Sequence, residues 1–506
     1  ACSIPAQDTS PSMSPVKRVA ILDMQPIDPP IGGGRLRLLG LYHALGEGVE
    51  TRYVGSYDWP GESYRKQQLS ETLSEEVVPL SDQHHRDSAA LSRLCGGKTV
   101  IDVAFSQQAA SSTDYIAAAT TAVEWADVVI FSHPWVFALV EDKLGPDKLV
   151  IYDSQNVEGY LRAQLLDRHS PVERELLYNI VENENRCGQR SDLVLCCSSE
   201  DQDMFTRIYN WPPTRCRLVP NGVMSDAILP AAAAEKQEAR ERLGVGRGLF
   251  LAFFIGSSYP PNVEAAMFIS KKLAPRMKEV VFVIAGGVTG ELSIGKAENL
   301  IVAGLIDEGE KTDWLRACDV AINPMFSGSG TNIKMFDFMA AGLPVVSTAK
   351  GARGIVAPRH NGFLVAAESA DAFVSDIARL KNEPDLYKGL SGLGRECVEQ
   401  HYSWEKISPA LGLLLQTEKQ ASRTITAASG RRHIGLFTTW NIRCGIAEES
   451  FKYARGSRQM GHRVSGFGPV LEDEFCADVA RDMLFPLNRI WYWDNKHWTS
   501  RSVDED

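Results

Sequence analysis

One stretch of the sequence, residues 326–346, combines residue types that suit a phosphorylated ligand. A strand is expected to end at Asn323, and Gly328 and Gly330 follow it in a loop. A helix is expected to begin near Asn332. Glycines let a backbone approach a ligand closely, and the free N–H groups and positive dipole end of a helix N-terminus favour a phosphate. The spacing therefore predicts an anion site between the loop and the helix.

Two charged side chains lie at the start of this expected helix. Lys334 and Asp337 are three residues apart, so they share one helix face. A lysine suits phosphate charge, and a carboxylate suits sugar hydroxyls. The alternative interpretation is a capped helix with a surface Lys–Asp pair, and the loop alone does not decide between the two. The candidate binding residues of this stretch are Gly328, Ser329, Gly330, Thr331, Asn332, Lys334 and Asp337.

Short apolar runs separated by helical stretches must position these residues. Strands that alternate with helices predict largely parallel sheets. We expect an α/β fold with two doubly wound, Rossmann-like domains, residues 16–228 and 245–420, whose strand ends face a cleft. The expected strands are 18–23, 51–54, 127–132, 149–153, 192–198 and 217–219 in the first domain, and 249–255, 280–285, 299–303, 319–323, 344–348 and 362–365 in the second.

The same pattern begins again after residue 430. Residues 431–437 have the composition of a fresh strand, and residues 441–450 contain a glycine turn that runs into a helix. We expect residues 430–506 to form a partial α/β segment. It is either the opening of another such domain, cut short, or a piece that packs on the main body.

The stretch at 328–346 resembles the donor-site signature of the retaining GT-B glycosyltransferases of family 4. In that family the helix carries two glutamates eight positions apart, before an Ala/Gly-rich turn and Pro-Val-Val. Asp337 occupies the second acidic position and Ser329 the first. Weaker likenesses extend over about residues 16–420. The supporting matches are Met339, Ala340, Gly342, Pro344, Val345 and Val346, and the segments 220–223, 254–262, 285–287, 302–304 and 401–404.

The resemblance implies a GT-B glycosyltransferase that moves a sugar from a nucleotide-sugar donor to a glycan or lipid-linked acceptor, with retention, in polysaccharide or glycoconjugate synthesis. It implies no cofactor, because the nucleotide-sugar is a substrate. It places Gly256 and Gly286 in loops that line the nucleotide pocket, and Gly33 and Gly34 beside the donor phosphates. The segment at 430–506 resembles the start of another glycosyltransferase domain.

The resemblance also implies that His133 lies near the transferred sugar. His133 follows an apolar strand that is expected to point toward the cleft. A lone histidine after a strand is structural more often than catalytic, so both interpretations stay open. The glycine triplet at 32–34 is similarly open, because it is often only a turn. It is not G-x-G-x-x-G and gives no support for a nicotinamide cofactor.

Departures from the family pattern keep two other functions open. Ser329 replaces the first acidic residue, and Ser257, Ser258 and Tyr259 stand where the family places a basic pair. A degenerate GT-B module that binds or assembles without catalysis would carry such losses. A sugar-nucleotide epimerase on the same fold is the other alternative.

We expect no metal site. His84 and His85 have no third ligand close in the sequence, and Asp201 and Asp203 have D-x-D spacing but lie in a helical stretch. The helix dipole and a lysine are expected to meet the diphosphate charge instead.

Composition limits the partners and the compartment. The chain has 506 residues with 64 acidic and 53 basic side chains, a net charge of -11, which makes a nucleic-acid partner improbable. Its ten cysteines show no C-x-x-C pair, which favours buried free thiols in a reducing cytoplasm. The N-terminal residues lack the pattern of a signal peptide. The longest apolar run, residues 249–255, is too short to cross a bilayer, so any membrane contact is expected to be peripheral.

Overall fold

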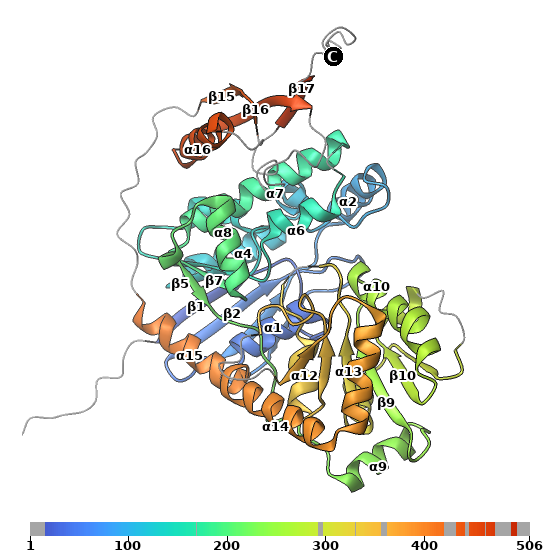
Figure 1. Ribbon diagram of the computed structural model, residues 1–506. Helices are drawn as coiled ribbons and strands as arrows, with labels where there is room; N and C mark the ends of the chain where they lie inside the picture. The colour runs from blue at the N-terminus through green and yellow to red at the C-terminus, as the bar shows by residue number, and fades with distance from the viewer. Residues whose placement is uncertain are drawn as a thin grey trace, which may run out of the picture.

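The computed structural model describes residues 16–167, 169–291, 297–328, 330–355, 362–418, 432–440, 445–460, 462–470 and 487–492. Within them the strands form three sheets, with helices between the strands (Figure 1). None of the described helices is long and apolar enough to span a membrane. The described cysteines are free and buried, as the composition predicts; these are Cys95, Cys187, Cys196, Cys197, Cys216, Cys318 and Cys397.

The first sheet has the strand order β3-β4-β2-β1-β5-β6-β7-β8 and is parallel except for the β3–β4 pair. The order reverses at β1, and ligands bind at such switch points in open α/β sheets. Its strands are β1 (Lys17–Leu22), β2 (Val49–Gly55), β3 (Arg65–Gln68), β4 (Leu73–Val77), β5 (Val128–Phe131), β6 (Leu149–Ser154), β7 (Leu193–Cys196) and β8 (Cys216–Leu218).

Helices that cover this sheet complete what we call the first lobe. The central strands are buried on both faces, which explains why β5 and β7 are continuous apolar runs. The helices are α1 (Gly33–Tyr42), α2 (Asp82–Leu94), α3 (Phe105–Gln108), α4 (Thr113–Trp125), α5 (Phe137–Val140), α6 (Glu158–Leu165), α7 (Pro171–Arg190) and α8 (Ser199–Tyr209).

The second sheet is parallel throughout, in the order β11-β10-β9-β12-β13-β14. With its helices it forms the second lobe, and its own switch point lies between β9 and β12. The strands are β9 (Phe250–Ile255), β10 (Val280–Ala285), β11 (Leu300–Gly304), β12 (Val320–Asn323), β13 (Val345–Ser347) and β14 (Phe363–Val365). The helices are α9 (Ala233–Arg242), α10 (Pro260–Phe268), α11 (Glu308–Ala317), α12 (Lys334–Ala340), α13 (Ala370–Asn382) and α14 (Pro384–His401).

The chain returns to the first lobe in α15 (Trp404–Thr417). This helix packs on α1 so closely that a Cβ at Gly40 would lie 2.3 Å from the Trp404 ring. Figure 1 shows α14 and α15 in orange, running from the second sheet to the first. The outgoing and returning segments meet between the lobes. There the Val223 N–H donates to the Tyr402 carbonyl at 2.9 Å, and the Trp404 N–H donates to the Val223 carbonyl at 3.0 Å.

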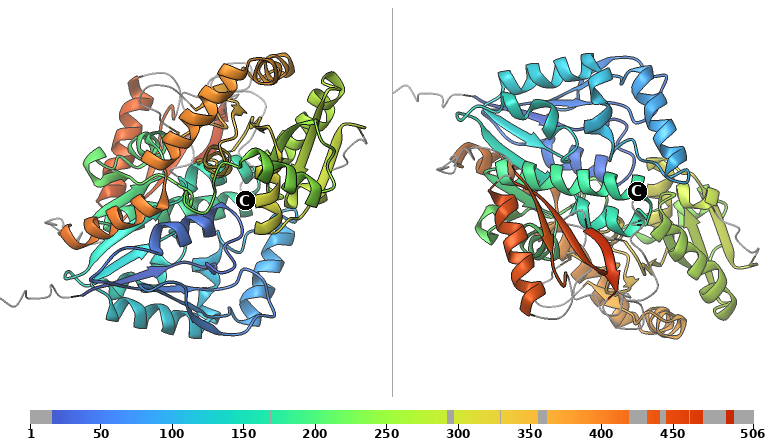
Figure 2. Two further views of the ribbon diagram at one scale, coloured as in Figure 1. Left: turned by 90° about the horizontal axis from the view of Figure 1, so that it is seen from below. Right: turned by 90° about the horizontal axis from the view of Figure 1, so that it is seen from above.

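The third sheet is small and parallel, in the order β15-β16-β17. It consists of β15 (His433–Phe437), α16 (Gly445–Gln459), β16 (Arg463–Val470) and β17 (Leu487–Tyr492). This unit lies over the helices of the first lobe (Figure 2), where Phe451 and Ala454 join the core cluster that contains Ile180. Arg458 forms an ion pair with Glu182 of α7.

Candidate functional site

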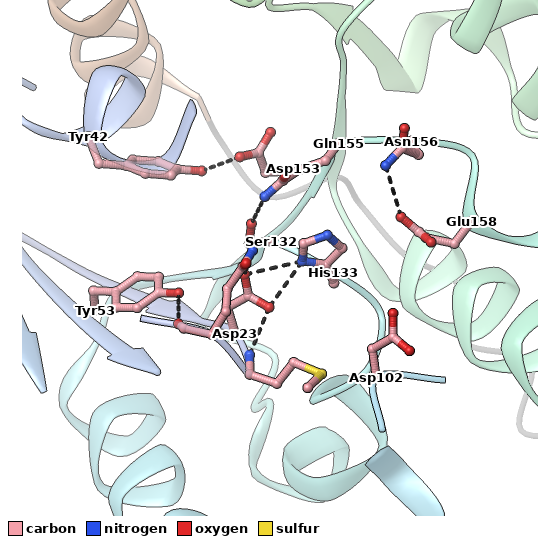
Figure 3. A network of polar contacts seen from close by, with 12 residues as sticks. Asp23, Tyr42, Tyr53, Asp102, Ser132, His133, Asp153, Gln155, Asn156 and Glu158 are labelled. Atoms are coloured by element: carbon pink, nitrogen blue, oxygen red, sulfur yellow. Dashed lines mark hydrogen bonds and ion pairs between the residues drawn. The ribbon is translucent and has the colours of Figure 1, made fainter. Parts of the chain in front are cut away.

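Candidate residues of the first lobe gather where β1, β5 and β6 end (Figure 3). Asp23 follows β1, His133 follows β5, and Gln155 follows β6. Because β1 and β5 are neighbours at the reversal of strand order, Asp23 and His133 lie at the switch point of the sheet. This is the place where a doubly wound sheet offers a ligand the ends of its strands.

His133 forms an ion pair with Asp23, a residue that the sequence did not single out. Its Nδ1 lies 3.0 Å from Oδ1 and 3.1 Å from Oδ2 of the buried Asp23. Burial by itself lowers the pKa of His133, but the Asp23 charge and hydrogen bond outweigh it and raise that pKa to about 9. The imidazole is therefore protonated at neutral pH, and it can donate a hydrogen bond but cannot accept a proton there.

The glycine turn at the start of α1 touches both lobes. A Cβ at Gly34 would lie 2.8 Å from Gln155 Oε1, so only glycine fits there without displacing that side chain. Gln155 in turn donates from Nε2 to Ser132 Oγ at 2.9 Å. A Cβ at Gly33 would lie 3.4 Å from Ile333 of the second lobe. The structure thus brings Gly33 and Gly34 to the strand ends that carry His133.

Lys334 begins α12 in the second lobe and has no charged partner among the described residues. Its Nζ donates to Asn262 Oδ1 at 2.7 Å and lies 4.4 Å from the centroid of the Phe254 ring. Burial lowers the pKa of Lys334 to about 7. Partial desolvation without a counter-charge disfavours the charged form of Lys334, and an anionic ligand would stabilise it.

The loop before α12 reaches across to the first lobe. Gly330 has φ +73, and a Cβ there would lie 2.9 Å from Asn156 Oδ1. Thr331 Oγ1 is buried without a hydrogen-bond partner, and Asn332 donates to the Gly351 carbonyl at 3.2 Å. Gly328 lies in the same loop with φ +102. Ser329, the predicted counterpart of the first acidic residue, lies outside the described residues.

Gly256 and Gly286, at the ends of β9 and β10, lie beside the Lys334 environment. Gly286 has φ +89, and a Cβ there would lie 2.5 Å from the Gly256 carbonyl oxygen. A Cβ at Gly256 would lie 2.9 Å from Asn262, which accepts the Lys334 hydrogen bond. The two predicted pocket loops therefore pack directly on each other.

Asp337 and Lys334 have separate partners and do not form a pair with each other. Asp337 forms an ion pair at 2.8 Å with Lys311 of α11, and its side chain is only 10% exposed. Burial raises the pKa of Asp337, and Lys311 opposes that rise. The alternative of a surface Lys334–Asp337 pair is therefore wrong, because each side chain is drawn to a different neighbouring helix. Contact between Asp337 and the donor stays a prediction.

The remaining polar candidates have structural partners. His84 lies in α2 and not in a loop; it is buried against Phe105, with its Nδ1 3.1 Å from Ser112 Oγ. Asp201, in α8, pairs with Arg353 of the second lobe. No group of three or more potential metal ligands occurs in the described part of the chain.

A buried ion pair fixes the elements that carry the first-lobe site. Arg37 of α1 lies 2.6 Å from Asp153 at the end of β6, and Tyr42 donates to the same carboxylate at 2.8 Å. Arg37 also donates to Asn221 Oδ1 at 3.0 Å. The glycine-turn helix, the β6 end and the segment leaving the first lobe are thereby fixed together. Sequence reasoning missed this pair because its members are 116 residues apart.

Comparison with known proteins identifies the second lobe. Residues 250–383 match the family described as glycosyl transferases group 1. These residues are a glycosyl transferase group 1 domain. The domain contains Lys334, Asp337 and the loop at 328–332, so the resemblance found in the sequence is confirmed at the family level.

Curated relatives of the glycosyl transferase group 1 domain carry transferase names. The chain is 26% identical over 247 residues to D-inositol 3-phosphate glycosyltransferase 2 of Catenulispora acidiphila, covering 45% of this chain and 56% of the relative. It is 25% identical over 222 residues to UDP-Gal:alpha-D-GlcNAc-diphosphoundecaprenol alpha-1,3-galactosyltransferase of Escherichia coli, covering 40% of this chain and 54% of the relative. The chain thus spans about half the length of these relatives.

Solved structures show the fold beyond this domain. Sucrose-phosphate synthase of Thermosynechococcus elongatus aligns with a TM-score of 0.59 at 16% identity, over 79% of this chain and 98% of the synthase. HepE of Anabaena, in complex with UDP and glucose, aligns with a TM-score of 0.57 at 14% identity, over 79% of this chain and 99% of HepE. The fold is GT-B, with two Rossmann-like lobes, as predicted.

Proposed function

We propose that this protein transfers a sugar from a nucleotide-sugar donor to an acceptor hydroxyl. The observation that carries the proposal is Lys334, a partly buried lysine with a lowered pKa and no charged partner among the described residues, at the start of α12 in a glycosyl transferase group 1 domain. The loop at 328–332 and this lysine would hold the donor diphosphate, since N–H groups and a cation are the natural partners of phosphate oxygens. Gly256 and Gly286 let the loops that end β9 and β10 pack against each other, and the nucleotide would bind beside these loops.

The proposed chemistry is a retaining displacement. The bond between the anomeric carbon and the diphosphate oxygen breaks, and the acceptor oxygen bonds to the same face of the anomeric carbon. The acceptor proton passes to the departing phosphate oxygen, so no side-chain base is needed. This scheme agrees with a protonated His133, which would donate a hydrogen bond to the transferred sugar. Lys334 would stabilise the negative charge that grows on the leaving diphosphate.

The proposed acceptor is a glycan or a lipid-linked sugar, in polysaccharide or glycoconjugate synthesis. The names of relatives support this class, since one acts on a diphosphoundecaprenol-linked sugar and another is a phosphatidyl-myo-inositol mannosyltransferase. We propose a cytoplasmic protein whose contact with a membrane-bound acceptor is peripheral. The donor nucleotide stays open, because the names of relatives and neighbours include both UDP-linked and GDP-linked sugars.

A thermal-shift screen with UDP, GDP, ADP and their sugars tests donor binding first. We expect one nucleoside diphosphate to raise the melting temperature in wild type and to lose most of that effect in Lys334→Met. A radiolabelled donor with this nucleotide then tests transfer to a lipid-linked acceptor. Binding without transfer to any acceptor would favour a non-catalytic module, and free epimerised donor formed without acceptor would favour an epimerase. Unchanged binding in Lys334→Met would refute the site.

A further inference from the structure

We propose that Asp23 is a positioning residue that fixes His133 as a hydrogen-bond donor to the substrate, by engaging Nδ1 and leaving Nε2 alone to meet the sugar. The role toward the sugar rests on the proposed transfer function, whereas the contact between Asp23 and His133 is a feature of the free protein. Figure 3 shows the second ring nitrogen of His133 pointing away from Asp23.

Sheet register fixes the approach of the two residues. Leu22 of β1 is paired with Phe131 of β5, and the Ser132 N–H donates to the Leu22 carbonyl at 3.2 Å. Asp23 directly follows Leu22, and His133 lies two residues beyond Phe131, so the pairing of these two central strands brings both residues to the same edge of the sheet. The bend that follows β5 then places the His133 ring against Asp23.

Asp23 is held in place by its own neighbours. Its Oδ1 accepts from the Met24 N–H at 2.7 Å, and its Oδ2 accepts from Gln25 Nε2 at 3.2 Å. Tyr115 donates its hydroxyl to the Asp23 carbonyl at 2.6 Å. The side chain is fully buried, so the carboxylate has no solvent to turn toward. A group fixed in this way can orient another side chain and hold its proton.

The His133 ring is restrained on its other sides. Trp135 stacks on it with an interplanar angle of 10° and 6.0 Å between ring centroids. Two charged groups of α6 face it: Glu158 favours the imidazolium, and Arg162 opposes it. Arg162 is itself paired with Glu158 and with Asp102, so its charge is largely compensated. Asp23 is therefore the group that sets the protonation and orientation of the ring.

The Asp23 carboxylate determines whether Nε2 of His133 can donate a hydrogen bond. With the carboxylate in place, both ring nitrogens carry protons, and Nε2–H is available as a donor. Without it, burial favours the neutral ring, in which one nitrogen becomes an acceptor. Asp23 thus decides whether the site offers a donor or an acceptor at this point. A donor can stabilise negative charge on a sugar oxygen as the glycosidic bond breaks.

The first test is an NMR titration of the His133 ring in the free protein, with its signal assigned by its loss in His133→Gln. In wild type we expect the imidazolium to persist to about pH 9. In Asp23→Asn we expect titration at or below the ordinary pKa of about 6.5. Asp127→Asn is the matched control, because Asp127 precedes β5 at the opposite end of the sheet and pairs with exposed Arg18. Wild-type titration near or below pH 6.5 would overturn the proposal, even if Asp23→Asn did not fold.

The second test separates positioning from folding. In Asp23→Asn we expect kcat to fall about 10- to 100-fold, the effect of losing one hydrogen bond to a charged group, with unchanged affinity for the nucleoside diphosphate. In the His133→Gln background the same substitution should have little further effect, because its target is gone. Equal losses in both backgrounds would overturn the proposal. A wild-type protein without transfer activity would refute the proposed function, and the titration would still decide the link between Asp23 and His133.

Discussion

Arg353 and Asp201 join the two lobes through an ion pair of 2.8 Å, with Asp201 only 3% exposed. Arg353 lies in the segment after β13, and Asp201 lies in α8 of the first lobe. The Gly351 carbonyl, two residues before Arg353, accepts hydrogen bonds from Asn323 and from Asn332 of the predicted donor loop. Contact between the lobes is therefore connected to the loop that we propose binds the diphosphate.

Loss of this ion pair should weaken donor use. In Arg353→Met we expect a higher KM for the donor, and a loss of stability of about 3–5 kcal/mol because the buried Asp201 loses its counter-charge. Steady-state kinetics and urea unfolding measure the two effects. Arg379→Met, which breaks an exposed pair with Asp376, is the matched control and should change neither. Normal KM and stability in folded Arg353→Met would show that the pair has no role.

Nucleotide binding should take up a proton. Free Lys334 has a lowered pKa of about 7, and a bound diphosphate stabilises its charged form. Affinity should therefore fall as pH rises above about 7, by up to about tenfold per pH unit until other groups titrate. Calorimetry at pH 8 in two buffers of different ionisation enthalpy measures the uptake. Lys334→Met should abolish the uptake, whereas Lys272→Met should retain it; no uptake in wild type would contradict the predicted role.

Truncation of His133 should affect turnover more than binding. In His133→Ala we expect kcat to fall about 100-fold, while nucleoside diphosphate affinity stays nearly unchanged, because the nucleotide is expected on the second lobe. A loss confined to turnover marks an interaction made chiefly in the transition state. Kinetics and calorimetry on the same preparation compare the two quantities. A folded variant with normal turnover would make His133 structural.

Transfer should not require a metal ion. The described residues hold no group of three or more potential metal ligands, and Lys334 can meet part of the diphosphate charge. Activity should persist in excess chelator. Full loss that manganese or magnesium restores would show that a metal ion takes part in the reaction.

The buried Arg37–Asp153 pair should be a large contributor to stability. Arg37→Met leaves Asp153 buried with Tyr42 as its remaining side-chain donor, so we expect a loss of about 3–5 kcal/mol in urea unfolding. Arg18→Met removes an exposed, solvent-screened pair with Asp127 and should change stability much less. Similar losses in the two variants would contradict this ranking.

The sequence predicted most strands and the family. It did not predict β3, β4 or the contacts between residues that are distant in the chain. β3 escaped prediction because its residues, Arg65–Gln68, include no apolar side chain. It is an edge strand, for which burial imposes no hydrophobic pattern. β4 was missed for a related reason: Leu73–Val77 has apolar residues only at its two ends, and its middle buried position is Glu75.

In the candidate site, too, adjacent residues could be predicted from the sequence but distant partners could not. The loop at 328–332 and Lys334 could be found because adjacent residues carry the signal. Asp23 could not be found as a partner of His133, since 110 residues separate them and only the pairing of β1 with β5 brings them together. The packing of α15 on α1 could not be predicted either, because an apolar helix face does not specify which element it packs against.

The paired crossings at Val223 and Tyr402 have a mechanical consequence. Two polypeptide segments connect the lobes, and because hydrogen bonds join them, any relative movement of the lobes must bend both segments together. The alignment of Ile333 with Gly33 and of Arg353 with Asp201 therefore depends on both connections. Cleavage of either segment alone would leave the lobes attached but would release that alignment.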